Sequence, residues 1–198
     1  KRRRRNIARL RNFLLYNALD TERYTLLVDA DIIEFHRADT LNYLIQSGKD
    51  IVVTRVQKGS DEDYDRDSWA GERAKPSSEE LSLMDENKWN EFKFVPHDVG
   101  GKLKHIYNFY KDPENVDERN HPEYVVQLDS VGGAVLFFKS VIFKQGVMFP
   151  PTYIVGTTWD RLEGYDGVET EGVCYLAKPL GYECWGMPNL VAEHNKND

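Results

Sequence analysis

Residues 24–35 read YTLLVDADIIEF, an apolar run that carries two aspartates, Asp29 and Asp31. The run predicts a strand over residues 25–33 that is covered on both faces of a sheet. Alternate side chains of a strand share a face, so the two aspartates are expected to point the same way. Adjacent carboxylates repel one another and resist burial unless a cation or a ligand lies between them. The pair therefore predicts a metal site.

Two unrelated enzyme classes place Asp-x-Asp at the end of a strand. In haloacid-dehalogenase-like phosphatases the first carboxylate is a nucleophile and the second a general acid. In nucleotide-sugar glycosyltransferases of the GT-A type, the two carboxylates hold a divalent metal that bridges the diphosphate. Phosphatases of that class continue with a small hydroxyl residue, whereas this chain continues with Ile32, Ile33 and Glu34. The context favours the transferase, and the phosphatase reading would require an aspartyl-phosphate at Asp29.

Further residues suited to chemistry follow in the second half of the chain. The segment EYVVQLDSVGGAVLFF predicts a strand that ends near Asp129 and then a glycine pair, Gly132 and Gly133. The pair permits either close approach of a ligand or a tight turn with no ligand. Glu169 and Glu171 open a predicted helix, where the helix dipole favours a carboxylate and a purely structural role is the alternative.

Charge is distributed unevenly along the 198 residues. The formal net charge is −7, yet seven of the 26 basic residues fall within the first eleven positions. The acidic remainder argues against nucleic acid as a partner, because tracking phosphates needs basic residues over a wide face. The sequence has no run of 18 apolar residues and no signal-peptide pattern, so any membrane anchor is expected upstream of Lys1.

The basic N-terminal tract predicts a helix over residues 3–19. Helical spacing of Ile7, Leu10, Leu14 and Ala18 indicates an amphipathic helix, and a solvated or targeting tail is the alternative. Three polar residues, at spacings of four and three, share one face of this helix beside the predicted metal strand. These are Arg5, Arg9 and Asn12.

The predicted order of elements indicates an α/β fold. A helix (3–19), a strand (25–33), a helix (38–47) and a strand (49–56) alternate, which is typical of a sheet with at least two parallel strands. Residues 57–122 are acidic and rich in turn residues, which predicts a long polar loop that is either a flexible insertion or a functional lid. Its aromatic residues, namely Trp69, Trp89, Phe92 and Phe94, are expected to bury against something.

The two cysteines, Cys174 and Cys184, are ten positions apart. With a helix over 169–180 and a strand over 181–186, a disulfide is geometrically possible but not required, so buried free thiols are expected and the disulfide is the alternative. The cysteine count does not decide the redox compartment.

Several blocks, in order, resemble the fungal mannan polymerase family of Golgi α-mannosyltransferases, glycosyltransferase family 62. They read RRRRNIARLRNFLL, LVDADI, GKDIVVTRV, YDRDSW, LDSVGGAVLFFKSVIFKQGVMFPP and YDGVETEGVCYLAKPLGYECWGMPNLVAEH. The resemblance covers most of the chain and is weakest over residues 71–122. It implies a single GT-A-like domain over 1–198, with a mixed central sheet flanked by helices.

The resemblance also implies an activity. Such enzymes are retaining transferases that use Mn²⁺ and GDP-mannose to extend α-1,6-linked mannose on N-glycans. They face the lumen of the Golgi, with a cis-Golgi location expected, and they work in complexes with related subunits. A GT-A domain ordinarily begins with a β-α-β unit that holds the base, so the opening strands, stem and membrane anchor are expected to be missing from this chain.

By analogy with this family, specific residues acquire expected roles. Asp29, Asp31 and His194 are expected to hold Mn²⁺, with an exposed terminal histidine as the alternative for His194. Asp129 is expected to bind donor mannose or hydroxyls of the oligomannose acceptor. Glu169 or Glu171 is expected to orient the acceptor or to steady an oxocarbenium-like state. Arginine forks fit phosphate oxygens, so the helix face and the glycine pair are expected to bind the donor. That set comprises Arg5, Arg9, Asn12, Asp29, Gly132 and Gly133.

Aromatic residues offer possible platforms for sugar stacking, and ordinary packing is the alternative for each. They are Tyr153, Trp159, Tyr165 and Trp185. The expected function is transfer of mannose from GDP-mannose onto an α-1,6-mannose chain. The alternative is a non-catalytic subunit with the same fold that scaffolds a partner transferase.

Overall fold

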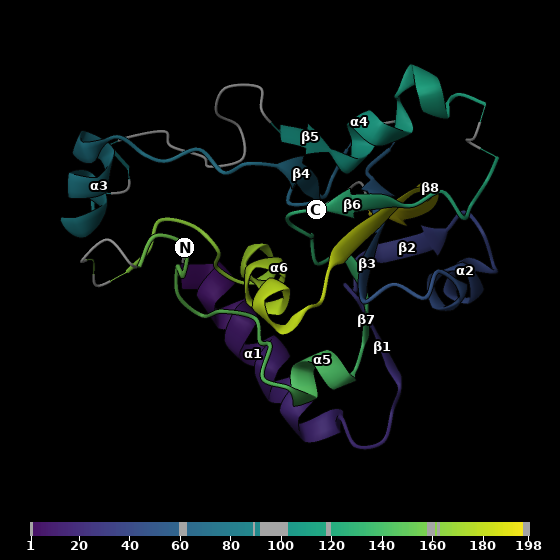
Figure 1. Cartoon of the computed structure of the whole chain (residues 1–198), viewed down its shortest axis with the longest axis horizontal. Coiled ribbons are helices and arrows are strands. Elements are labelled where there is room, and N and C mark those ends of the chain that lie inside the picture. The colour runs from purple at the N-terminus through teal and green to yellow at the C-terminus, as the bar shows by residue number, and fades with distance from the viewer. Residues whose placement is uncertain are drawn as a thin grey trace.

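The computed structural model describes residues 2–59, 63–88, 90–91, 103–117, 120–157, 161 and 163–195. A central mixed sheet is flanked by helices (Figure 1), as the family resemblance implies. Along the first third of the chain run α1 (Arg2–Ala18), β1 (Tyr24–Val28), β2 (Ile32–Phe35), α2 (Thr40–Gln46) and β3 (Ile51–Gln57). Later come β6 (Val126–Leu128), β7 (Val135–Lys139), α5 (Val141–Lys144), α6 (Thr170–Ala177), the 3-10 turn η2 (Lys178–Leu180) and β8 (Cys184–His194).

The strands of the central sheet follow the order β1-β7-β3-β8-β2, and β6 also pairs with β8. β3 and β8 are parallel, and the other pairs are antiparallel. The prediction of at least two parallel strands is therefore confirmed. The eleven-residue β8 is long enough to pair with β6 along its first half and with β2 along its second half.

The predicted single strand over 25–33 is wrong. It is two strands, β1 and β2, which stand at opposite ends of the strand order. β1 extends the sheet beside β7, whereas β2 pairs with the end of β8. Neither is covered on both faces, since Val28 is 42% exposed and Ile33 is 62% exposed. A continuous apolar run does not reveal that the chain turns sharply between the two strands.

Side chains that alternate along the inner strands face two hydrophobic cores, one on each side of the sheet. Ile51 and Val53 of β3 face one core, which α1, α5 and α6 cover, while Val52 between them faces the core that α2 covers with Leu44. Figure 1 shows the same division, with α2 across the sheet from α1, α5 and α6. The helix predicted over 3–19 is confirmed as α1.

The predicted buried face of this first helix is wrong. Ala8 and Leu15 are its buried residues, whereas Leu10 is 67% and Leu14 is 54% exposed. Apolar side chains are spread around the helix, so their spacing fits more than one face.

Residues 57–122 are not one continuous loop. Their described part contains β4 (Trp69–Gly71), α3 (Ser78–Asp85), β5 (Leu103–His105), α4 (Ile106–Tyr110) and the 3-10 turn η1 (Pro113–Asn115). β4 and β5 form a two-stranded sheet, and α3 begins at a capping box made by Ser77 and Glu80. Trp69 is buried as expected. Trp89, Phe92 and Phe94 lie outside the described residues.

Cys174 of α6 and Cys184 of β8 form a disulfide. The bridge fixes the helix that follows Glu169 to the long strand that ends at His194. The expectation of buried free thiols is therefore wrong, and the alternative of a disulfide is the one observed. Among the helices that the structure describes, none combines the length and the apolar character needed to cross a bilayer.

Candidate functional site

The Asp29-Ala30-Asp31 segment forms the turn between β1 and β2. The amide of Asp29 donates to the carbonyl of Ala134 at 2.9 Å, and the amide of Ile32 donates to the carbonyl of Asp29 at 3.1 Å. The two carboxylates therefore project from a tight turn rather than from one strand face. This turn lies beside the start of β7 and the end of β8.

Asp31 and His194, which are expected to hold the same metal ion, lie next to each other at this turn. His194 Nε2 lies 2.9 Å from Asp31 Oδ2, and the amide of Asn195 donates to the carbonyl of Asp31 at 2.8 Å. The histidine is buried, so the alternative of an exposed terminal residue is excluded. The ring of Tyr64 stacks on the imidazole, with 3.7 Å between the ring centroids.

Two buried atoms of this pair lack a hydrogen-bond partner within the described residues, Asp31 Oδ1 and His194 Nε2. The nitrogen approaches Asp31 Oδ2 without the alignment of a hydrogen bond. Unpaired buried polar atoms are costly, and carboxylate oxygen with imidazole nitrogen is a donor set that suits Mn²⁺. The two residues therefore fit a divalent cation.

Asp29 has a different partner. Arg11 donates to Asp29 at 2.8 Å, to Glu169 at 2.7 Å and to the carbonyl of Gly133 at 3.0 Å. No group of three or more Asp, Glu, His or Cys residues among those described is arranged to hold a metal ion. The structure thus brings together Asp31 and His194 of the expected metal set and leaves Asp29 paired with Arg11.

A pocket of about 490 Å³ opens at the turn. It is lined by Arg3, Ile7, Arg11, Asp29, Ala30, Asp31 and Asn195. The α1 members of this set are four residues apart, so they form one stripe of the helix. Sequence reasoning missed Arg3 and Arg11, because arginines occur on several faces of this helix and the buried face was misjudged.

The three α1 residues expected beside the aspartates do not line this pocket. Arg5 pairs with Glu163, and Arg9 is exposed. Asn12 exchanges two hydrogen bonds of 2.8 Å with the backbone of Phe149, which occupies its amide.

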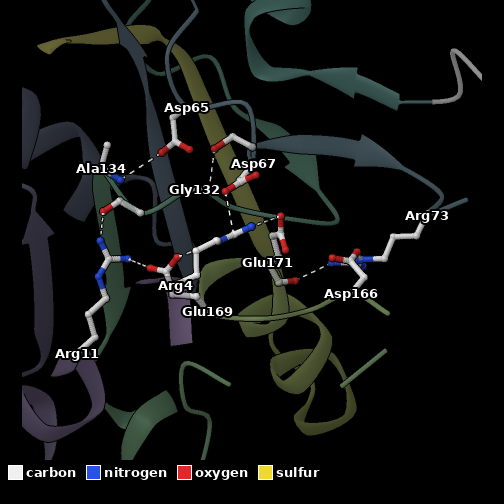
Figure 2. A network of polar contacts seen from close by, with 12 residues as sticks. Arg4, Arg11, Asp65, Asp67, Arg73, Gly132, Ala134, Asp166, Glu169 and Glu171 are labelled. Carbon is white, nitrogen blue, oxygen red and sulfur yellow. Dashed lines mark hydrogen bonds and ion pairs between the residues drawn. The ribbon is translucent and has the colours of Figure 1, made fainter. Parts of the chain in front are cut away.

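The first turns of α1 also approach the start of α6 (Figure 2). Arg4 lies 2.9 Å from Glu171, 3.1 Å from Asp67 and 3.7 Å from Glu169. Glu169 has φ +60° and ψ −131°, a backbone conformation that is strained for a residue with a side chain. Neither glutamate caps the helix through its side chain, and both are buried ion-pair partners of α1 arginines.

Burial changes the proton affinity of these acids. Burial raises the pKa of Glu169, and the positive charges of Arg11 and Arg4 oppose this shift. Burial also raises the pKa of Glu171 well above its ordinary value, and the negative charges of Asp67 and Asp166 add to that shift. Perturbed carboxylates gathered beside a pocket are typical of functional sites.

The glycine pair gives room to protein side chains. A Cβ on Gly132 would lie 1.9 Å from Asp65 Oδ2, and one on Gly133 would lie 2.1 Å from a guanidinium nitrogen of Arg11. The close approach that the sequence predicts for a ligand is thus made by Asp65 and Arg11. Asp65 accepts a hydrogen bond from the amide of Ala134 at 3.2 Å, and burial, together with Asp67, raises its pKa to about 7.

Asp129 belongs to a second pocket, away from the turn. It is exposed, and its Oδ2 accepts a hydrogen bond from the amide of Gly71 at 2.8 Å. Of the aromatic residues considered as sugar platforms, those that the structure describes line neither pocket. Tyr153 packs under Arg5, Tyr165 is buried, and Trp185 lies under Lys49. Trp159 lies outside the described residues.

Comparison with known proteins identifies the family. The Anp1 family model matches residues 1–153, well over half of the chain. This chain belongs to the Anp1 family. Similar proteins include the mannan polymerase complex subunit MNN9 of Candida albicans, 29% identical over 98% of this chain and 50% of its own length.

Two further relatives carry related names. The mannan polymerase complex subunit mnn9 of Schizosaccharomyces pombe is 27% identical, over 99% of this chain and 53% of its own length. The mannan polymerase I complex VAN1 subunit of Saccharomyces cerevisiae is 27% identical, over 97% of this chain and 33% of its own length. The chain therefore spans about half or less of the length of these relatives, and its resemblance to fungal mannan polymerase subunits is confirmed.

Proposed function

We propose that this member of the Anp1 family is a metal-dependent, retaining mannosyltransferase with a GT-A-like fold. It moves mannose from GDP-mannose onto an α-1,6-mannose chain of N-glycans. Relatives are named as subunits of mannan polymerase complexes, which supports mannan as the product and related subunits as partners. Its place of action is the Golgi lumen, and the disulfide agrees with an oxidising compartment.

The observation that carries this proposal is a pair of buried atoms that have no hydrogen-bond partner in the described part of the chain and lie beside an arginine-lined pocket. Asp31 Oδ1 and His194 Nε2 are buried, and Asp31 also lines the pocket that Arg3 and Arg11 enter. A nucleoside diphosphate needs both a cation and guanidinium groups around its oxygens. At this turn, Asp31 and His194 supply ligands for the cation, and Arg3 and Arg11 supply the guanidinium groups.

Each residue then has a defined task. Asp31 and His194 would hold Mn²⁺, and Asp29 would join them once Arg11 releases its carboxylate. When bound, the metal neutralises the charge that develops on the departing diphosphate. Arg3 and Arg11 bind diphosphate oxygens, and Tyr64 holds the imidazole ring in place by stacking.

The acids around Arg4 position the arginines. Glu169 holds Arg11 at the turn, and Glu171 and Asp67 hold the neighbouring Arg4. In a retaining transfer on one face of the sugar, the leaving phosphate accepts the proton of the acceptor hydroxyl. No protein base is therefore required, and the raised pKa of Glu169 does not have to serve proton abstraction.

A non-catalytic scaffold subunit is the second candidate. The contact of Arg11 with Asp29 favours a scaffold, because Asp29 is then not available as a metal ligand. Among the residues described, only Asp31 and His194 of the expected metal set then lie together at the turn. A scaffold keeps the fold and even the metal site without turnover.

A transfer assay separates the two candidates. Radiolabelled GDP-mannose and an α-1,6-linked mannobiose acceptor are incubated with the protein and Mn²⁺, and labelled product is counted. We expect turnover that falls by about 100-fold in Asp31→Asn, because a metal ligand is lost. The matched control is Asp39→Asn, a surface aspartate paired with Arg37, which should retain activity. A protein that binds GDP-mannose but gives no product would identify a scaffold.

A further inference from the structure

The second pocket, which Asp129 lines, lies between α6, β6 and the start of β8 and has a volume of about 260 Å³. We propose that it binds a neutral oligosaccharide, the mannose units of the acceptor glycan that lie beyond the reacting unit. This assignment rests on the proposed transferase function. The side chains that carry it are Gln127, Asp129, Tyr175, Lys178, Tyr182 and Glu183.

The lining combines the two surfaces that a pyranose presents. Tyr175 and Tyr182 offer aromatic rings for the apolar face of a sugar ring, and Tyr175 is 45% exposed. Asp129 and Glu183 accept hydrogen bonds from hydroxyl groups, and Lys178 donates them. The chemistry is that of a polyhydroxylated ligand with one flat apolar side.

Charge disfavours an anion or a nucleotide at this pocket. Asp129 and Glu183 balance Lys178 and Arg73, so no net positive field is present to attract phosphate. The pocket at Asp31 is the one with arginines for a nucleoside diphosphate.

The pocket is built on constrained groups. The disulfide between Cys174 and Cys184 forms part of its wall, and the hydroxyl of Tyr182 donates to Gln145 at 2.7 Å. The amide of Gly71 fixes one oxygen of Asp129. Preorganised groups lose little entropy when they bind a ligand, which suits recognition of a weakly held glycan.

Arg73 connects this pocket to the ion-pair network of the first site. Arg73 lines the pocket, and its guanidinium donates to the carbonyl of Glu171 at 2.6 Å and pairs with Asp166 (Figure 2). Tyr175 follows Glu171 by four residues on α6, a rise of about 6 Å along the helix. A glycan held at Tyr175 therefore lies about one helical turn from the acids that surround Arg4.

Direct titration tests the assignment. An α-1,6-linked mannotetraose is added to the isotope-labelled protein, and the dissociation constant is taken from NMR chemical shifts. We expect Tyr175→Ala to weaken binding by about tenfold through loss of the stacking surface, and Asp129→Asn to weaken it by a smaller factor. Tyr16→Ala, at a tyrosine 58% exposed on α1 outside both pockets, is the control and should bind as the wild type does.

The outcomes separate this inference from the proposed function. Unchanged affinity in both pocket variants, or no binding of mannotetraose by the folded wild type, overturns the pocket assignment even if GDP-mannose binds. Weakened glycan binding in Tyr175→Ala with unaltered GDP-mannose affinity supports it. Weakened glycan binding in a protein that has no affinity for GDP-mannose supports the pocket and rejects the donor site.

Discussion

Asp65 fills the space that the missing side chain of Gly132 leaves beside β7. Its carboxylate accepts a hydrogen bond from the amide of Ala134, and Arg11 contacts the adjacent carbonyl of Gly133. Burial raises the pKa of Asp65 from 3.8 to about 7. A carboxyl group in this position is favoured in its neutral form, because Asp67 and Asp63 add negative charge nearby. The glycine pair is thus explained by packing of protein groups at the edge of the site.

A pH dependence of stability follows from this residue. The folded state keeps the proton on Asp65 up to about pH 7, whereas the unfolded chain releases it near pH 3.8. The free energy of unfolding therefore falls as pH rises through this window, by at most about 1.4 kcal/mol per pH unit. The side chain of Asp65→Asn stays neutral at every pH. The free energy of unfolding of this variant should therefore rise relative to that of the wild type between pH 4.5 and 7, and the difference should stay constant above pH 7.

Urea unfolding at a series of pH values measures this effect. Comparison of the two proteins cancels the other buried acids, because Glu169 and Glu171 titrate in both. A stability difference that is the same at pH 4.5 and pH 7 would show that Asp65 keeps an ordinary pKa.

Single residues of the site differ in how far sequence could predict them. The meeting of Asp31 with His194 could be predicted, because the Asp-x-Asp signal and the family resemblance pointed to the pair. The partner of Asp29 could not, since α1 carries arginines on every side and only packing selects Arg11. Asp65 and Asp67 had no distinct signal within a stretch rich in acids.

At the scale of elements, α6 and β8 act as one unit. α6 carries Glu171 at its start and Tyr175 further along, and β8 ends at His194. The disulfide between Cys174 and Cys184 joins the two elements. It spans the short turn η2, which ends at Gly181 in a left-handed backbone conformation. Rigid connection of these elements holds the two pockets in a fixed relation.

Removal of the disulfide should therefore lower stability. We expect a Cys174→Ala and Cys184→Ala double variant to lose about 2 to 3 kcal/mol of unfolding free energy, as the loop-closure account gives for a loop of about ten residues. Chemical denaturation measures the loss. Dithiothreitol should destabilise the wild type and leave the double variant unchanged, and equal sensitivity of the two would show that no disulfide forms in the protein.

Long periodic elements were predictable, and the turn between β1 and β2 was not. The α1 helix and the β3 strand have patterns that tolerate small errors at their ends. The split of the run at Asp29 depends on pairing with β7 and β8, which lie more than 100 residues away in the chain. Local sequence cannot report that pairing.

For the molecule as a whole, the mixed sheet brings the first helix and the residue after β8 to one site. Arg3 and Arg11 come from the first helix, Asp31 from the first turn, and Asn195 follows the last strand. The ion-pair network joins this pocket to the one that Tyr175 lines. Two pockets joined by one network agree with the proposed reaction, in which one pocket would hold the nucleotide-bound sugar and the other the glycan.

Calorimetric titration with GDP-mannose, in the presence and absence of Mn²⁺, tests the donor site most directly. Binding by the wild type should require Mn²⁺ and should be abolished by Asp31→Ala, whereas Asp39→Ala should bind as the wild type does. Affinity for GDP-mannose that is independent of the metal, or that survives Asp31→Ala, would contradict the assignment of Asp31 and His194 to the metal.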